Sequence, residues 1–324
     1  MAGTDTSHQF YSHGKLLLTG EYLVLDGALA LALPTRPGQS LHVDPLESPE
    51  PELHWKSFTD TGACWFSGRF ALPGGNYLEG TDRAVGERLE QILRAGKKLR
   101  PSLWPTSSLS GYAVRTELEF PRNWGLGTSS TLIANLAQWW RVDPYQLLAD
   151  TFGGSGYDLA CAASERAVFY QLEAGAPQVT PVDFAPPFAD QLSFLYLEKK
   201  QNSRTGIARY REKGTPPAEL LEKISDISTR LARERSLAGF CELLENHEQI
   251  IAEWMETEPV KARYFPDFPG TIKSLGAWGG DFVLVASERN FPAVKQYFSD
   301  RGYPTLVPFR EMVLPTENAS PNSN

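Results

Sequence analysis

The segment PRNWGLGTSST, residues 121–131, constrains the fold of this chain more than any other stretch. It follows GYAVRTELEF (111–120), whose alternating apolar and polar residues predict a strand, and it precedes TLIANLAQWW, which predicts a buried helix at about 129–140. Gly125 and Gly127 allow turns that side chains forbid, and the hydroxyl residues after them can cap the helix. This order predicts a phosphate-binding loop, with an ordinary capped glycine turn as the alternative.

Composition limits the classes of protein that remain. The length of 324 residues favours two domains, and 41% hydrophobic residues supply a sizeable core. The formal net charge of −8 argues against a nucleic-acid-binding surface, but it allows a small anionic substrate in a locally cationic pocket. Three cysteines without a CxxC pair argue against structural zinc and a disulfide framework. The polar N-terminus and the lack of a long apolar run predict a soluble, cytoplasmic protein that does not enter membranes.

The first apolar segment, residues 11–35, predicts a small sheet in which Asp26-Gly27 forms a hairpin turn. Strands are expected near 15–19, 21–25 and 28–33. Lys15 and Glu21 are unusual in such a segment. Lys15 can lie at a strand edge with its charge in water, and Glu21 can occupy a turn, so structural and functional interpretations both stay open.

Further patterns extend the prediction along the chain. ELHWKSF and CWFSGRFAL predict strands, and 82–96 predicts a structural helix with Gly96 at its C′ position. AVFYQLEAG followed by QVTPVDF predicts a strand or a hairpin, and the proline-rich stretch 184–190 predicts a domain boundary. Two amphipathic helices are expected in 217–257, the second capped by Ser236. The last module predicts a glycine loop, a strand, a helix and a strand.

A second glycine-rich turn, in TFGGSGYDLACAASE (151–165), places Asp158 at the head of a helix of small residues. A carboxylate there can simply favour the start of the helix. It can also serve as a general base, because taking a proton from a substrate hydroxyl requires a fixed carboxylate beside the reacting oxygen. The pattern alone does not separate these two roles.

Four segments in order resemble the motifs of the GHMP kinases, the family of galactokinase, homoserine kinase, mevalonate kinase and phosphomevalonate kinase. GKLLLTGEYLVLDGALALAL (14–33) resembles their first motif, and the segment 121–131 resembles their phosphate loop. SLGAWGGDFVLVAS (274–287) resembles their third motif, and GSGYDLACA (154–162) resembles the segment with the catalytic aspartate. We use the names first motif, phosphate loop and third motif for these ranges below.

The resemblance implies an α+β fold of two domains. An N-terminal ATP-binding domain like the second domain of ribosomal protein S5 is expected at 1–185, and a C-terminal ferredoxin-like domain at 186–314. The polar end of the chain, 315–324, predicts a disordered tail. A homodimer is an open alternative to a monomer.

The resemblance also implies a kinase that uses ATP and Mg²⁺. Asp158 matches the catalytic aspartate, Lys15 the lysine beside it, and Ser129 the serine that binds phosphate and metal. A lysine near Asp158 would keep the carboxylate ionised and stabilise charge on the transferred group. The other candidate ATP contacts in the phosphate loop are Asn123, Gly125, Leu126, Gly127, Thr128 and Ser130. The third motif adds Gly276, Gly279, Gly280 and Asp281.

Within the family, GYDLACA and Asp281 are most similar to phosphomevalonate kinase, and LGTSS favours a kinase over the decarboxylase branch. The implied acceptor is mevalonate or phosphomevalonate, of the isoprenoid precursor pathway, and the choice between them stays open. The residues on the substrate side are expected to be Glu21, Ser203 and Arg204.

The sequence departs from the family pattern in several places. Trp278 replaces a glycine of the third motif, and Ser-Glu-Arg at 164–166 replaces a glycine pair. Leu147 stands where mevalonate kinase has a second metal-binding glutamate, so metal coordination would rest on Ser129 and phosphate oxygens, or on another acid such as Asp150. These departures favour two alternatives: a nucleotide-binding homologue with a regulatory role and no turnover, or a kinase for another small hydroxy acid.

Overall fold

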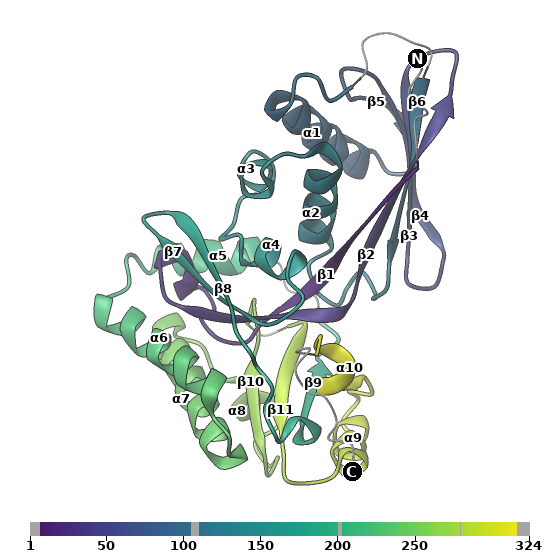
Figure 1. Ribbon diagram of the computed structural model, residues 1–324. Helices are drawn as coiled ribbons and strands as arrows, with labels where there is room; N and C mark the ends of the chain where they lie inside the picture. Colours follow the sequence, from purple (N-terminus) through teal and green to yellow (C-terminus); the bar gives the residue numbers. More distant parts are fainter. Residues whose placement is uncertain (1–6, 105–109, 200–202, 279, 316–324) are drawn as a thin grey trace, which may run out of the picture. The chain divides into compact units, whose positions relative to one another are not determined.

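The computed structural model describes residues 7–104, 110–199, 203–278 and 280–315, and Figure 1 shows the path of the chain. The contacts divide the chain into two compact units, each assembled from separate segments. Unit 1 comprises the described parts of Met1–Gly14, Pro37–Arg122 and Gly127–Ala163. Unit 2 comprises those of Lys15–Arg36, Asn123–Leu126 and Ser164–Asn324. The two long strands β1 (His8–Leu17) and β2 (Ala30–Glu47) contribute residues to both units.

Unit 1 consists of a sheet with helices on one side (Figure 1). Its strands follow the order β5-β4-β3-β6-β2; β3 and β6 are parallel, and the other neighbours are antiparallel. The added strands are β3 (Glu52–Phe58), β4 (Cys64–Ala71), β5 (Asn76–Gly80) and β6 (Ser110–Leu118). The helices are α1 (Arg83–Leu99), α2 (Thr128–Trp140), α3 (Pro144–Ala149) and α4 (Tyr157–Ala162). Large side chains such as Phe66, Phe70, Trp104 and Trp140 fill the space between sheet and helices.

Buried polar contacts fix helix α2 on the strands of unit 1. Asn135 accepts a hydrogen bond from Ser12 of β1 at 2.8 Å and donates one to the Gln39 carbonyl of β2 at 2.9 Å. Thr131 donates to the Gln39 side chain at 2.6 Å. Because all four residues are buried, each polar group would cost free energy if its partner were lost. The start of α2, where the phosphate loop ends, is thereby held in one place.

Unit 2 contains two sets of paired strands and most of the helices. One set joins β2 to the hairpin β7 (Val168–Glu173) and β8 (Ala176–Pro181). The other is an antiparallel sheet of order β10-β11-β9-β12. Its strands are β9 (Leu192–Tyr196), β10 (Thr271–Ser274), β11 (Phe282–Ala286) and β12 (Leu306–Pro308). The helical elements are η1 (Leu23–Asp26), η2 (Ala189–Gln191), α5 (Ser203–Glu212), α6 (Ala218–Arg233), α7 (Leu237–Met255), α8 (Val260–Tyr264), α9 (Phe291–Ser299) and α10 (Phe309–Met312).

Several predicted elements are confirmed. The strands at ELHWKSF, CWFSGRFAL and 111–120 are β3, β4 and β6, and the predicted strand or hairpin is the hairpin β7-β8. The two amphipathic helices are α6 and α7, and Ser236 caps α7 by accepting the Gly239 N–H at 3.2 Å. The predicted tail at 315–324 lies outside the described residues, apart from Pro315.

The strand expected at 21–25, with its hairpin turn at Asp26-Gly27, is wrong. Gly20 has a φ of 87° and Tyr22 a φ of 62°, and the chain then forms the short helix η1, which ends at Gly27. Leu23 and Val24 of η1 are buried, so their apolar character reflects burial in a turn and not strand pairing. A short apolar run does not by itself distinguish these two structures.

One other expectation needs correction, and one strand was not predicted. Gly96 does not end α1, which continues to Leu99; a Cβ atom at Gly96 would lie 2.4 Å from the Trp140 ring, so close packing explains the glycine. Strand β10, directly before the third motif, was not expected, because its four residues are too few to show a pattern.

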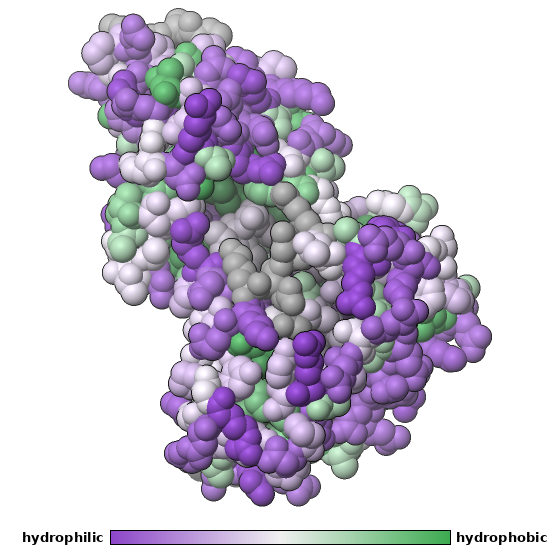
Figure 2. All heavy atoms as spheres, turned by 180° about the vertical axis from the view of Figure 1, so that it is seen from behind, coloured by the Kyte–Doolittle hydropathy of each residue, from purple (hydrophilic) through white to green (hydrophobic). Residues whose placement is uncertain are grey.

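The surface seen in Figure 2 is mostly hydrophilic, with apolar side chains between. Among the described residues, the exposed large hydrophobic side chains are Leu78 of β5 and Val179 of β8. Single exposed side chains of this kind are ordinary in globular proteins. No helix within the described ranges is long and apolar enough to cross a membrane.

Candidate phosphate-transfer site

Unit 2 brings the first motif against the phosphate loop. The backbone N–H of Lys15 donates to the carbonyl of Leu126 at 2.9 Å. This bond places the end of β1, and therefore the predicted catalytic lysine, next to the loop. The Lys15 side chain is half-buried.

The third motif meets the same loop from the other sheet of unit 2. A Cβ atom at Gly125 would lie 2.3 Å from the Oδ2 atom of Asp281, so glycine is required for this close contact. The rings of Trp124 and Phe282 meet edge to face at 5.1 Å, and the Tyr196 hydroxyl donates to the Asn123 carbonyl at 3.2 Å. The first half of the phosphate loop therefore rests on the ends of β9 and β11.

Asp281 has a φ of 50°, which is uncommon for a residue with a side chain. Two backbone hydrogen bonds hold it there: its N–H donates to the Lys199 carbonyl at 2.6 Å, and its carbonyl accepts the Leu197 N–H at 2.8 Å. Of the predicted glycines, Gly276 has a φ of 57°, Gly280 is buried, and Gly279 lies outside the described residues.

The second half of the phosphate loop begins helix α2 in unit 1. Gly127, with a φ of 94°, is the N-cap residue, and no side chain in the described part of the chain caps this end. The N–H groups of Thr128, Ser129 and Ser130 have no partner within the helix, because the first bond runs from the Thr131 N–H to the Gly127 carbonyl at 2.9 Å. Such an end suits phosphate oxygens. Ser129 is exposed and Ser130 is buried, so Ser129 is the serine whose hydroxyl a ligand can reach.

Asp158 lies in the first turn of α4, also in unit 1. Gly156, with a φ of 88°, precedes this helix as its N-cap residue. The Asp158 side chain is half-buried, and α4 packs against α2. A carboxylate in the first turn interacts favourably with the helix dipole, so the local structure suits an acid at this position.

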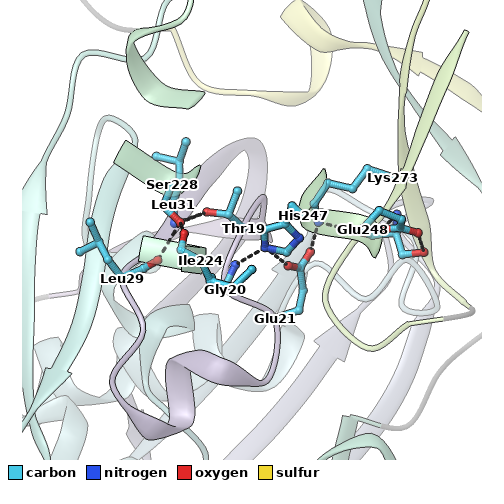
Figure 3. A network of polar contacts seen from close by, with 11 residues as sticks. Thr19, Gly20, Glu21, Leu29, Leu31, Ile224, Ser228, His247, Glu248 and Lys273 are labelled. Carbon is cyan, nitrogen blue, oxygen red and sulfur yellow. Dashed lines mark hydrogen bonds and ion pairs between the residues drawn. The ribbon is translucent and has the colours of Figure 1, made fainter. Parts of the chain in front are cut away.

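Glu21 is fully buried in unit 2. Its carboxylate pairs with Lys273 of β10, and its Oε2 atom lies 3.3 Å from Nε2 of His247 on α7 (Figure 3). A substrate contact was expected from Glu21, but its side chain has no exposed surface. Lys273 and His247 were not predicted. A lysine in the short apolar strand before the third motif was the signal that could have drawn attention to this position.

Helix α5 carries the other substrate-side candidates, Ser203 and Arg204, whose side chains are not among those described. Farther along α5, the Tyr210 hydroxyl donates to Asp26 of η1 at 2.5 Å, and Arg211 pairs with the same carboxylate at 2.9 Å. The Tyr210 ring stacks on Tyr22 at 5.7 Å. Helix α5 is thus attached to the first motif.

Tyr22 also joins the first motif to the third. The backbone N–H of Trp278 donates to the Tyr22 hydroxyl, which lowers the pKa of this hydroxyl while burial raises it more strongly. The backbone of Trp278 therefore links the third motif to the first motif. The net effect is a raised pKa, so Tyr22 is a neutral hydroxyl at physiological pH.

The residues of the site could bind Mg²⁺ only if phosphate oxygens supplied most of its ligands. The described residues contain no group of three or more His, Cys, Asp or Glu side chains that could hold a metal ion. Leu147 is fully buried in the core of unit 1, whereas Asp150 is exposed and pairs with Lys98 at 3.5 Å. The chain therefore offers a hydroxyl ligand, Ser129, and the triphosphate would complete the shell.

No family model and no curated protein matches this sequence. Solved structures do match its fold. Streptococcus pneumoniae phosphomevalonate kinase, in complex with phosphomevalonate and AMPPNP, has a TM-score of 0.66 at 15% identity, over 92% of this chain and 99% of that chain. L. major mevalonate kinase, in complex with R-mevalonate, has a TM-score of 0.60 at 13% identity, over 88% of each chain.

Lactococcus lactis galactokinase, complexed with galactose, has a TM-score of 0.64 at 14% identity, over 96% of this chain and 94% of that chain. These three neighbours are all kinases of small molecules. Their similarity extends over 88% to 96% of this chain. The chain therefore has the fold of the GHMP kinases, as the resemblance of its four motifs predicts.

Proposed function

We propose that this protein is an ATP-dependent kinase that transfers the γ-phosphoryl group of ATP to mevalonate or phosphomevalonate. The observation that carries the proposal is the meeting of three motifs within unit 2. The Lys15 N–H bonds to Leu126, Gly125 packs on Asp281, and Tyr22 bonds to Trp278. If these glycine-rich segments served only as turns, nothing would require them to contact one another.

The proposed roles follow from the chemistry of the residues. Asp158 accepts the proton of the acceptor hydroxyl, and Lys15 stabilises negative charge on the transferred group. The backbone at Gly125, Leu126 and Gly127, with the free N–H groups that begin α2, binds the phosphates. When bound, Mg²⁺ neutralises charge on the triphosphate, and Ser129 is the ligand that this chain provides.

The finer description of the fold is part of the proposal. From β9 to β12 the order is β9, the helices α5 to α8, β10, β11, α9 and β12. With α5 to α8 counted as one helical segment this is β-α-β-β-α-β, which supports the predicted ferredoxin-like domain at 186–314. The S5-like domain at 1–185, the homodimer and the cytoplasmic location stay predictions.

The test is ADP release by the purified protein with ATP and Mg²⁺. Mevalonate, phosphomevalonate and galactose are offered in turn, and a mevalonate-type kinase should turn over one of the first two. Asp158→Asn should abolish that turnover. Asp60→Asn, at an exposed turn position outside the four motifs, is the matched control and should leave it unchanged. No ADP release with either acid would overturn the assignment of the acceptor.

A second candidate is a nucleotide-binding homologue without turnover. Two observations favour it: Leu147 is a core residue where a metal-binding acid is expected, and Trp278 stands in the third motif. This candidate predicts that an ATP analogue binds and that wild type and Asp158→Asn release ADP at the same background rate. Turnover that depends on Asp158 would exclude it.

A further inference from the structure

Four titratable side chains form a buried cluster behind the first motif in unit 2 (Figure 3). Glu21 comes from the first motif, His247 and Glu248 from α7, and Lys273 from β10. Glu21, His247 and Lys273 have no exposed surface, and Glu248 is 4% exposed. Burying an unbalanced charge is costly, so the charges in this cluster have to compensate one another.

Hydrogen bonds identify Glu248 as the ionised carboxylate. Its Oε1 atom accepts from the Ser274 hydroxyl at 2.7 Å, and its Oε2 atom accepts from the Ser274 N–H at 3.0 Å. Both oxygens therefore face donors, as a carboxylate requires. Lys273 donates to the Ser274 carbonyl at 2.8 Å and to Oε1 of Glu21. The positive charge of Lys273 thus balances the negative charge of Glu248.

The second oxygen of Glu21 has a different environment. Its Oε2 atom lies 3.3 Å from Nε2 of His247, and this nitrogen accepts the Gly20 N–H at 3.0 Å. A nitrogen that accepts carries no proton, so two acceptor atoms face each other unless Glu21 carries a proton. Charge balance points the same way, because an ionised Glu21 would leave the cluster with one excess negative charge.

We propose that Glu21 is a positioning residue that works as a neutral carboxylic acid, with the proton on Oε2 directed at Nε2 of His247, whose single lone pair it shares with the Gly20 N–H. The groups that face it are Lys273 from β10, His247 and Glu248 from α7, and Tyr22 from its own turn. Burial raises the pKa of Glu21 to about 7 and lowers the pKa of His247 well below its usual value. Burial also raises the pKa of Glu248, so it is the two Ser274 donors that assign the ionised form to Glu248 and the proton to Glu21.

The proton on Glu21 controls the turn that carries Tyr22. The Gly20 N–H bonds to His247 of α7, and Oε2 of Glu21 lies 3.3 Å from the same nitrogen. Tyr22 follows directly, bonded to Trp278 of the third motif and stacked on Tyr210 of α5. Loss of the proton places an oxygen with negative charge against an acceptor nitrogen, which loosens the turn. For the part that concerns catalysis, this inference rests on the proposed kinase function.

The experiment compares the amide hydrogen exchange of residues 20–22 and 274–278 at pH 6 and pH 8.5, after correction for the intrinsic rates. Glu21→Gln imitates the acid, because its amide oxygen accepts from Lys273 and its NH₂ group donates to His247. Protection in the wild type should fall at least tenfold between the two pH values, whereas Glu21→Gln should keep its protection at both. Glu21→Ala should expose the turn at both.

Two results would overturn the proposal. One is wild-type protection that does not change with pH; the other is a folded Glu21→Gln protein whose turn is as open as that of Glu21→Ala. If Glu21→Gln does not fold, the ¹³Cδ shift of Glu21 in the wild type decides the question. That shift should titrate near neutral pH, and a shift that stays at the ionised value down to pH 5 contradicts the proposal.

A kinetic measurement extends the test to function. With the acceptor that is turned over, the wild-type KM should rise several-fold between pH 6 and pH 8.5, and the KM of Glu21→Gln should stay constant. A KM that rises equally in both proteins contradicts the positioning role. If no acceptor is turned over, the kinase assignment fails, but hydrogen exchange still decides the state of Glu21.

Discussion

Gly125 of the phosphate loop packs directly against the carboxylate of Asp281 in the third motif. A Cβ atom on Gly125 would lie 2.3 Å from Oδ2 of Asp281, and the two residues have φ values of 68° and 50°. Neither residue can move far, because Asp281 is bonded through its backbone to Leu197 and Lys199. This contact fixes the path of the loop at the point where it turns toward α2.

We expect Gly125→Ala to weaken nucleotide binding about tenfold or more, because the methyl group displaces the loop from Asp281. Gly153→Ala is the matched control: Gly153 has a φ of 67°, and no heavy atom of the described residues lies within 4 Å of its Cβ position. Both substitutions share the backbone strain of about 1–2 kcal/mol. Titration with a fluorescent ATP analogue measures the difference.

The double variant Gly125→Ala, Asp281→Ala removes the clashing carboxylate. It should recover part of the affinity that Gly125→Ala loses. Equal affinities for Gly125→Ala and Gly153→Ala would show that the contact with Asp281 does not shape the nucleotide site.

Asp158→Asn should lower kcat by about 10²–10⁴-fold, the usual contribution of a general base. The affinity for the ATP analogue and the melting temperature should change little, because Asn keeps the shape of the side chain. Single-turnover kinetics measures the chemical step. A loss confined to KM would contradict the role of Asp158 as a base.

The pH dependence of stability should reveal Glu21 and His247 separately. The raised pKa of Glu21 means that the folded state holds a proton that the unfolded chain releases above about pH 4.5. Its contribution therefore favours folding at low pH and declines until pH reaches about 7, by about 3 kcal/mol in all. The lowered pKa of His247 has the opposite effect, because the unfolded chain gains a proton below about pH 6.5 that the folded state refuses.

Between about pH 5 and pH 6.5 these two contributions oppose each other. Glu21→Gln removes the contribution of Glu21 alone, so the variant should lose more stability than the wild type when the pH falls from 7 to 5. The expected excess is about 2–3 kcal/mol. Urea unfolding at both pH values measures it, and parallel behaviour of the two proteins would contradict the assignment of the proton to Glu21.

Gly96→Ala should destabilise unit 1 by about 1–3 kcal/mol, although alanine is the better helix former, because its Cβ atom would lie 2.4 Å from the Trp140 ring. Gln91→Ala, at an exposed position of the same helix, is the control. Alanine is a good helix former and no core contact is lost there, so this change should alter the stability by less than about 0.5 kcal/mol. Thermal unfolding compares them, and an unchanged stability in Gly96→Ala would show that α1 and α2 pack less closely than described.

The sequence by itself determined the motifs and much of the secondary structure. Alternation predicted β6, helical spacing predicted α6 and α7, and glycines beside hydroxyl residues predicted a loop that leads into α2. Such signals are local, since each depends on residues that are neighbours along the chain. The same locality explains the errors, because Leu23 and Gly96 owe their identity to packing against residues far away in the sequence.

Only the tertiary structure decided what the acids and lysines of the chain contact. Glu21 and Lys273 are 252 residues apart along the chain, yet with His247 they form one buried cluster. Likewise, the contact between Gly125 and Asp281 depends on how β9 and β11 carry the loop. Proton positions and charge balance are properties of such clusters, because they depend on the distances between groups that the chain brings together when it folds.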